Sequence, residues 1–385
     1  DNLIYVSDKE SLNGAGSITF TAMKPDGIKV IKTFTFTENS YKAGLNVSYE
    51  NTGSSVITEK PALSLSMISK AENRSELLHE MVYLSGKELK RVHADKIKDE
   101  KAVSLGMDWA YLGDKYFITA VIPSKASDAE IYSKKLSDEL YEAGIVFTPL
   151  QIKPGETKGM EYGLYFGPKE VGILKAAGSK LERAIDLGFF DLVAYPMLLS
   201  FKWMYEVIPN YGVVVILLTV LIKIIFWPLS QKSYKSMKDM QKLAPLMEQI
   251  REKYKDDKER LNKEVMDLYK RHKVNPLGGC LPMILQIPVF FALYAVLGGA
   301  VELRHAPFIL WITDLSTKDP YYVTPVIMGV TMFIQQKMTP SATADPMQQK
   351  VMMLMPVIFT FMFLNFSSGL VLYWLVNNVL SIGQQ

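Results

Sequence analysis

A single lysine, Lys223, lies inside the apolar run from Val213 to Trp227, where Thr219 is the only other polar residue. A lysine at the centre of a membrane helix costs roughly 2.5–3.5 kcal/mol on insertion scales. Helical rise from residue 211 places Lys223 about 18 Å along the run and about 9 Å from its other end near Leu229. A lone lysine could reach that interface with its stem. Its role therefore depends on what other helices present at the same depth.

Polar side chains recur at comparable or neighbouring depths in every other apolar segment. Isolated polar groups are unfavourable in lipid, so we expect these side chains to face one another or a shared water-filled space. The pattern predicts a hydrated cavity in one half of the bilayer, to which Lys223 supplies positive charge. The alternative is a snorkelling lysine and ordinary packing. The polar residues are Thr219, Gln286, Thr331, Gln335, Gln336, Thr360, Asn377 and Asn378.

The apolar segments predict a membrane core at 211–385, each segment being near the ~20 residues that cross a bilayer. Between the first two segments, the block at 231–273 carries thirteen Lys or Arg against eight Asp or Glu, whereas the loop at 301–320 has two Lys or Arg. The positive-inside rule then makes 231–273 cytoplasmic. It also places the N-terminal domain outside and the C-terminus inside. Such a domain needs a signal or a further span upstream of Asp1, and we expect a span. The five predicted spans are 211–229, 277–299, 321–338, 348–366 and 368–384.

The N-terminal part, 1–181, has the period-2 alternation of half-buried strands, with apolar residues at Ile28, Val30, Phe34 and Phe36. We predict an all-β sandwich with one or two helices. One helix is expected over 124–144, with Ile131, Leu136 and Leu140 on a face, and strands and turns over 152–175. We find no catalytic constellation here, and a spacer or binding module is the favoured interpretation.

Two further segments are predicted to be helical. Residues 182–210 mix aromatic and charged side chains around Pro196, which indicates an amphipathic helix in the membrane interface. A buried soluble helix is the alternative. The block 231–273 has apolar residues at helical spacing and predicts a helical hairpin with a narrow apolar seam. The charges of this block have two interpretations that the sequence favours equally. They form a solvated face, or they form a basic arm that touches ribosomal RNA, anionic lipid or a partner.

Several function classes are excluded. The net charge of +3 is too small to indicate a DNA-binding protein, and the single cysteine, Cys280, cannot form an internal disulfide. The four histidines have no metal-ligand spacing, and there is no phosphate-binding loop that would hold a nucleotide. We therefore expect no metal and no cofactor.

Consecutive motifs from about residue 150 to 385 resemble the YidC membrane protein insertase family, which includes the oxidase-assembly proteins of mitochondria and their thylakoid relatives. They are YFGPK at 165–169, DLGFFDLVAYPMLLSFKWMY at 186–205, NPLGGCLPMILQIPVFFALYAVL at 275–297, GAVELRHAPFILWITDLSTKDPYY at 299–322, MGVTMFIQQKM at 328–338, DPMQQKVMMLMPVIFTFMF at 345–363 and SSGLVLYWLVNN at 367–378. The large N-terminal domain is typical of the bacterial branch with two membranes.

The resemblance implies a periplasmic β-supersandwich and a five-helix core in the bacterial inner membrane, with a hydrophilic groove open to the cytoplasm and to lipid. Lys223 stands where the family has a groove arginine. The resemblance also implies nascent-chain contacts at Thr219, Tyr373 and Trp374, and an essential cytoplasmic hairpin at 231–273. The expected partners are nascent membrane proteins, lipid, the Sec translocon and the ribosome. Depth alone adds Gln286, Gln335, Asn365 and Asn377 as groove candidates.

A channel and a protease are the two alternatives to an insertase that uses no nucleotide. An ion or solute channel predicts rings of charge or two similar halves, and neither occurs. An intramembrane protease could pair Ser367 or Ser368 with Lys223. Helical rise separates these serines from the lysine by roughly 15–20 Å in depth, which is too far for a hydrogen bond. We therefore expect no enzyme activity.

Overall fold

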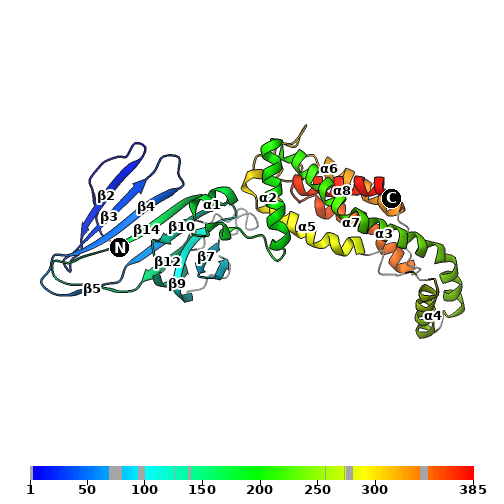
Figure 1. Cartoon of the computed structure of the whole chain (residues 1–385), viewed down its shortest axis with the longest axis horizontal. Helices are drawn as coiled ribbons and strands as arrows, with labels where there is room; N and C mark the ends of the chain where they lie inside the picture. The colour runs from blue at the N-terminus through cyan, green and yellow to red at the C-terminus, as the bar shows by residue number, and fades with distance from the viewer. Residues whose placement is uncertain are drawn as a thin grey trace. The chain divides into compact units, whose positions relative to one another are not determined.

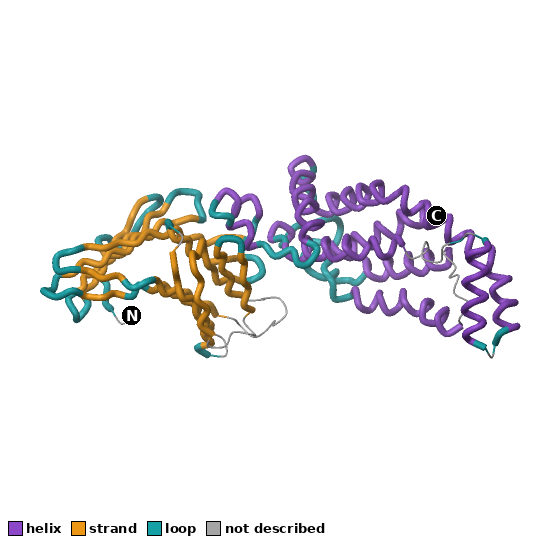
Figure 2. Tube along the Cα trace, turned by 60° about the horizontal axis from the view of Figure 1, so that its bottom comes forward, coloured by secondary structure: helices purple, strands orange, loops and turns teal. Residues whose placement is uncertain are grey.

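The computed structural model describes residues 3–68, 80–93, 100–125, 127–137, 140–255, 257–272, 274, 281–338 and 346–385. The chain divides into two compact units, Asp1–Ile185 and Asp186–Gln385. The first unit is built mainly of strands and the second of helices (Figures 1 and 2). Cys280, the turn residue 256 and the predicted start of a span at 277 lie outside the described residues.

The first unit is a β-sandwich built on a twelve-stranded antiparallel sheet with the order β1-β2-β3-β4-β14-β10-β9-β11-β12-β6, where β7 pairs with β9 and with β8. A separate pair joins β5 and β13. The strands are β1 Val6–Ser7, β2 Gly16–Met23, β3 Ile28–Phe36, β4 Lys42–Asn51, β5 Ile57–Glu59, β6 Ala62–Ile68, β7 Glu80–Ser85, β8 Glu88–His93, β9 Glu100–Gly113, β10 Phe117–Pro123, β11 Ser127–Lys135, β12 Leu140–Phe147, β13 Leu150–Ile152 and β14 Thr157–Pro168.

Alternation along the strands builds two apolar cores. Met81 and Tyr83 of β7 belong to one core, whereas Val82 and Leu84 belong to the other. Successive side chains of a strand point to opposite faces, so a strand buried on both faces has no polar side. The second core also takes in the short helix α1, Val171–Ala177, and the 3₁₀ turn η3, Leu181–Ala184. The predicted all-β sandwich with one or two helices is confirmed.

The predicted helix over 124–144 is wrong. The segment forms β11 and β12, which pair with each other in register from Ala129 opposite Phe147 to Lys135 opposite Tyr141. Burial alternates along it, because Ala129, Ile131 and Ser133 are buried, and Leu136, which we placed on a helix face, is 51% exposed. Pairing with β9 and β6 outweighs the helical propensity of its Lys, Glu and Leu residues. The strand-and-turn prediction for 152–175 holds through β14, but α1 begins at Val171.

A buried charge cluster fixes the end of this unit. Glu80 accepts hydrogen bonds from Lys169 Nζ at 2.7 Å, from the Tyr111 hydroxyl at 2.5 Å and from Arg91 at 3.1 Å. Arg91 also donates to the Tyr111 hydroxyl and to the backbone carbonyl of Ala184, each at 3.1 Å. The cluster therefore satisfies a buried carboxylate and holds η3 against the sheet.

The second unit is helical, in agreement with the predicted all-α core. The predicted interfacial segment contains α2, and one continuous helix, α3, spans the first apolar run and the first arm of the charged block. α3 is long and apolar enough to cross a membrane, and Ile284–Gly299 and Val351–Phe363 are shorter apolar helices. The elements are α2 Asp191–Val207, α3 Tyr211–Lys253, α4 Lys258–Arg271, α5 Leu281–Gly299, η5 Val301–Leu303, α6 Val323–Met338, α7 Pro346–Phe363 and α8 Ser368–Gln384.

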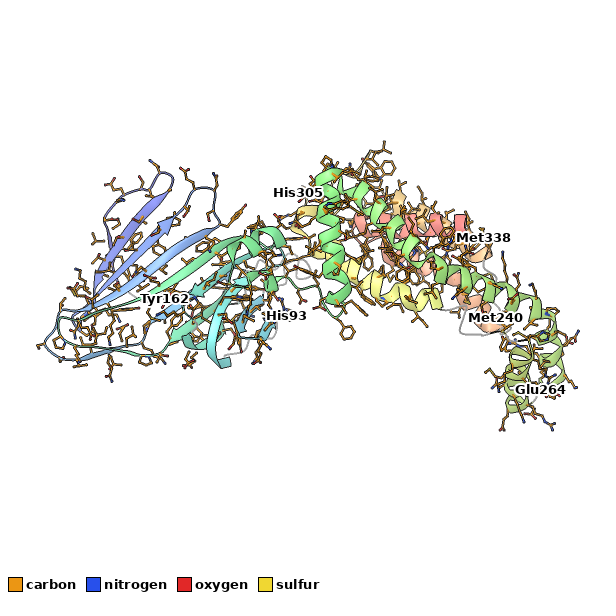
Figure 3. The ribbon with its side chains drawn as sticks, in the orientation of Figure 1. His93, Tyr162, Met240, Glu264, His305 and Met338 are labelled. Atoms are coloured by element: carbon orange, nitrogen blue, oxygen red, sulfur yellow. The ribbon has the colours of Figure 1, made fainter. Side chains whose placement is uncertain are left out.

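The charged block forms the predicted helical hairpin between the end of α3 and α4 (Figure 3 labels Met240 and Glu264 on the two helices). Its apolar seam is small and consists of Met240, Leu243, Met247, Leu268 and Tyr269. Asp257 caps α4 by accepting a hydrogen bond from the Arg260 N–H. The narrow seam leaves the basic and acidic side chains of the hairpin facing solvent.

Candidate functional site

Lys223 lies on α3 and is half-buried. Its Nζ donates a hydrogen bond to the hydroxyl of Ser381 on α8, at 2.7 Å. Ser381 is 3% exposed, and its own hydroxyl donates to the carbonyl of Asn377, one turn earlier, at 2.6 Å. The lysine is thus joined to a buried polar position on a helix 158 residues away in the chain.

Thr219 lies one helical turn from Lys223 on the same face of α3. Its side chain is 1% exposed, and its hydroxyl donates to the Val215 carbonyl at 2.6 Å. This bond satisfies the threonine without a partner helix. The Thr219 side chain is therefore covered by its neighbours and already has its hydrogen bond.

Two more polar contacts cross between helices beside this pair. Gln286 of α5 donates to the hydroxyl of Tyr373 on α8, and Tyr373 is 1% exposed. Asn378 of α8 donates to the Thr331 hydroxyl on α6 at 3.3 Å. Tyr373, Asn377 and Ser381 repeat at four-residue intervals, so they form a stripe about 12 Å long on α8. Tyr373 and Asn377 therefore lie on this stripe. Lys223 of α3 and Gln286 of α5 are hydrogen-bonded to it.

The remaining predicted site residues are placed differently. Gln335 is half-buried on α6, next to Gln336, whose amide donates to the Met352 carbonyl of α7. Trp374 packs among aromatic rings, with Phe290 of α5 at 5.2 Å and Phe363 of α7 at 5.3 Å between ring centroids. It contributes an apolar wall beside the polar stripe.

Asn365 does not join the stripe. It is exposed in the turn between α7 and α8, because α7 ends at Phe363. The depth assigned to Asn365 assumed that 348–366 is one uninterrupted helix. Because α7 ends at Phe363, Asn365 lies after the helix. Its placement gives no support to a groove role.

The serine–lysine arrangement considered from the sequence is not formed. Ser368 donates to the Thr317 carbonyl at 2.8 Å, and Lys223 contacts Ser381 instead. The Lys223–Ser381 distance would suit a catalytic pair, but the proton directions do not. In this structure the ammonium donates to the serine, and the serine hydroxyl donates to the Asn377 carbonyl.

The loop over 300–322, for which the sequence predicted no particular contacts, ties three helix ends together. The Asn210 amide at the start of α3 donates to the Phe308 carbonyl at 3.2 Å. The Gly369 N–H of α8 donates to the Leu315 carbonyl at 3.0 Å. At α6, the buried Asp319 accepts from the Thr324 N–H at 2.8 Å and from the Thr324 hydroxyl at 2.7 Å.

Asp319 also accepts hydrogen bonds from the Trp311 indole at 3.1 Å and from the Tyr321 N–H at 2.9 Å. Burial raises the pKa of the Asp319 carboxyl, but these bonds and those from Thr324 lower it further, to below its ordinary value. The carboxylate is therefore charged and fixed. The sequence signal was the Asp-Pro pair before an apolar run, which is typical of a helix start.

Two family models together match nearly the whole chain. The family model described as YidC periplasmic domain matches residues 2–200, and the model described as 60Kd inner membrane protein matches residues 203–385. The chain belongs to the YidC family. The resemblance drawn from the motifs is thereby confirmed, and it extends through the β unit.

Curated relatives align with this chain over its whole length. A membrane protein insertase YidC from Geotalea daltonii is 48% identical over 393 residues, covering 100% of this chain and 74% of the relative. The protein of the same name from Geobacter sulfurreducens is 49% identical over 396 residues, covering 100% and 73%. A solved structure, described as an active YidC insertase crystal structure with the first transmembrane domain resolved, is 20% identical, with a TM-score of 0.46 over 99% of this chain and 78% of that one.

Proposed function

We propose that this protein is a membrane protein insertase that receives hydrophobic nascent chains in a polar groove between α3, α5, α6 and α8. The groove opens to the cytoplasm and to lipid, and the chains leave it into the bilayer without nucleotide hydrolysis. The protein acts alone or with the Sec translocon. The observation that carries the proposal is a charged lysine inside an apolar helix, hydrogen-bonded to a neighbouring helix, with further polar pairs beside it.

Unpaired polar groups support a hydrated groove. Gln336 Oε1 and both amide atoms of Gln384 are buried without a hydrogen-bond partner among the residues that the structure describes. Buried polar atoms in proteins are nearly always bonded to protein or to ordered water. In a bilayer the penalty for leaving them unpaired is higher still. Water, or the polar part of a substrate, satisfies them in this proposal.

The groove lowers the barrier to moving a substrate's polar tail. Lys223 offers a positive charge at intermediate depth, which attracts the tail. The substrate's own apolar segment then partitions into lipid, and this transfer contributes roughly 25 cal/mol per Å² of buried apolar surface. A lysine presents a point charge rather than the planar fork of an arginine. It therefore attracts an acidic tail without requiring bidentate geometry.

The charge distribution sets the direction of transfer. In this proposal the basic hairpin of α3 and α4 faces the cytoplasm, where it meets the ribosome or the Sec translocon, and the β unit lies in the periplasm. The loop over 300–322 then lies at the outer ends of α3, α6 and α8. Its hydrogen bonds to those ends close the outer side, so that substrates enter from the cytoplasm and leave sideways.

The test is insertion of single-span substrates into liposomes that contain the full chain, with acidic, neutral or basic outer tails. Lys223→Ala is expected to lower insertion of acidic tails by at least about tenfold, because it removes an attraction in a half-buried site. Basic tails are expected to change little. Protease protection of the tail measures insertion.

Lys337→Ala is the matched control, because Lys337 lies exposed on α6 with its ammonium 4.8 Å from the centre of the Phe333 ring. It is expected to leave all three substrates unaffected. Equal dependence of acidic and basic tails on Lys223 would contradict the electrostatic part of the proposal.

A further inference from the structure

We propose that Ser381 is a positioning residue for Lys223. Its hydroxyl holds the ammonium beside the polar stripe of α8 in a resting state, and an acidic group of the substrate replaces it there. This inference rests on the proposed function and assigns to it a residue that neither depth nor resemblance had indicated.

The need for such a residue follows from the length of the lysine side chain. The end of the apolar run near Leu229 lies about 9 Å from Lys223 by helical rise. A four-carbon stem on a flexible side chain can cover much of that distance toward water. Without a fixed acceptor, the ammonium would therefore point out of the groove rather than toward a substrate.

Ser381 supplies that acceptor in a fixed orientation. A hydroxyl has one proton and two lone pairs. The proton of Ser381 is directed to the Asn377 carbonyl at 2.6 Å, so its lone pairs are left for the Lys223 ammonium at 2.7 Å. The serine is buried, at 3% exposure. The chain Lys223 to Ser381 to Asn377 is directional.

The strength of this contact suits a reversible state. An ammonium donates three hydrogen bonds, and Ser381 takes one of them. A carboxylate binds an ammonium more strongly than a neutral hydroxyl does, because both partners are charged. An acidic substrate group can therefore displace the serine, whereas a carboxylate at position 381 would hold the lysine permanently. A serine orients the charge and still releases it.

The experiment measures liposome insertion of acidic-tail and neutral-tail substrates by the full chain. Ser381→Ala is expected to lower insertion of the acidic tail by about tenfold, since a hydrogen bond to a charged group is lost, and to leave the neutral tail unchanged. Ser381→Thr keeps the hydroxyl and is expected to restore insertion. In a Lys223→Ala background, Ser381→Ala is expected to add nothing.

Ser200→Ala is the matched control. Ser200 also donates to the carbonyl one turn earlier, from α2 to Pro196 at 2.9 Å, so the same substitution removes the same type of bond away from Lys223. If Ser381→Ala lowers insertion of both tails equally, or adds to the effect of Lys223→Ala, Ser381 only packs α8 and the inference is overturned. If Ser381→Thr fails like Ser381→Ala, the hydroxyl is not the active feature.

The two single variants also separate this inference from the proposed function. An acidic-tail defect in Lys223→Ala without one in Ser381→Ala overturns the inference alone. Absence of a defect in Lys223→Ala contradicts the proposed role of the groove charge itself.

Discussion

At the scale of residues, Glu80 governs a pH dependence outside the membrane-spanning helices. Burial raises the pKa of the Glu80 carboxyl, but the charges of Lys169 and Arg91 and the hydrogen bonds to it lower it to below its ordinary value of 4.5. A depressed pKa means that the contribution of Glu80 to stability is complete above pH 4.5 and is lost as the pH falls through the folded-state value. Burial lowers the pKa of the Lys169 ammonium below its ordinary value.

We predict that Glu80→Gln destabilises the β unit by roughly 3 kcal/mol at pH 7, because two buried cations lose their carboxylate. The variant should also lose less stability than the natural protein as the pH falls below 4.5. Pulse-labelling hydrogen exchange of β7 and β9 peptides across a urea series measures both. Glu88→Gln, an exposed change on the adjacent strand, is the control. Parallel acid profiles for the natural protein and Glu80→Gln would contradict the assignment.

Sequence analysis identified one partner of the central contact and missed the other. Lys223 stood out because a charge in an apolar run has a large and recognisable free-energy penalty. Ser381 carries no charge and occurs near the end of the chain, so nothing in its sequence neighbourhood marked it. Only the packing of α8 against α3 makes it the acceptor. For Asn365, the assignment from depth depended on where α7 ends, and the structure places this residue in the turn after Phe363.

At the scale of elements, the start of α3 packs closely against the 300–322 loop because Gly212 has no side chain. A methyl group on Gly212 would overlap the ring of Phe308, whereas a methyl group on Gly298 of α5 would meet nothing within 4 Å. We predict that Gly212→Ala destabilises the helical unit by about 1–3 kcal/mol through overpacking. Gly298→Ala is expected to be neutral or stabilising by up to about 1 kcal/mol.

Thermal unfolding of both variants in detergent tests this prediction. A lower melting temperature for Gly212→Ala and an unchanged or higher one for Gly298→Ala is the expected result. If the two variants melt together, the contact between α3 and Phe308 does not hold the loop.

Helical elements were more predictable than strands. The apolar segments of the second unit are long and their amphipathic hairpin is strongly periodic, so local pattern and final structure agree. In the β unit, the segment from Ser127 to Phe147 combines residues of high helical propensity with a period-2 burial pattern that appears only when β9 and β6 pair with it. Non-local pairing decided its structure, and no short-range signal reports it.

At the scale of the whole molecule, the division into a strand unit and a helical unit gives the proposed topology a direct test. In a Cys280→Ser background, one cysteine is placed on the β unit by Ser54→Cys and another on the hairpin by Gln249→Cys, both at exposed positions. We predict that an impermeant maleimide labels Ser54→Cys only from the periplasmic side and Gln249→Cys only from the cytoplasmic side. Vesicles of the two orientations make the comparison, and labelling of both sites from one side would contradict the topology.

The order of the domains and the helical core were predictable because composition changes sharply along the chain. How the helices converge was not, since the polar contacts that α8 makes with α3, α5 and α6 join residues that are 158, 87 and 47 positions apart. Asn378 and Thr331, for example, lie on different predicted spans and share no local motif. Their pairing follows from helix packing.

The central claim is that nascent chains pass the polar stripe of α8, and the most direct measurement is site-specific photo-crosslinking. A crosslinker at Asn377, half-buried on the stripe, is compared with one at Val379, which is 52% exposed on the same helix. A ribosome-stalled single-span chain is offered to each variant in liposomes. The account predicts a strong crosslink from position 377 and a weak one from 379. Equal crosslinks, or a stronger one from 379, would place the substrate on the lipid-facing surface and contradict a groove.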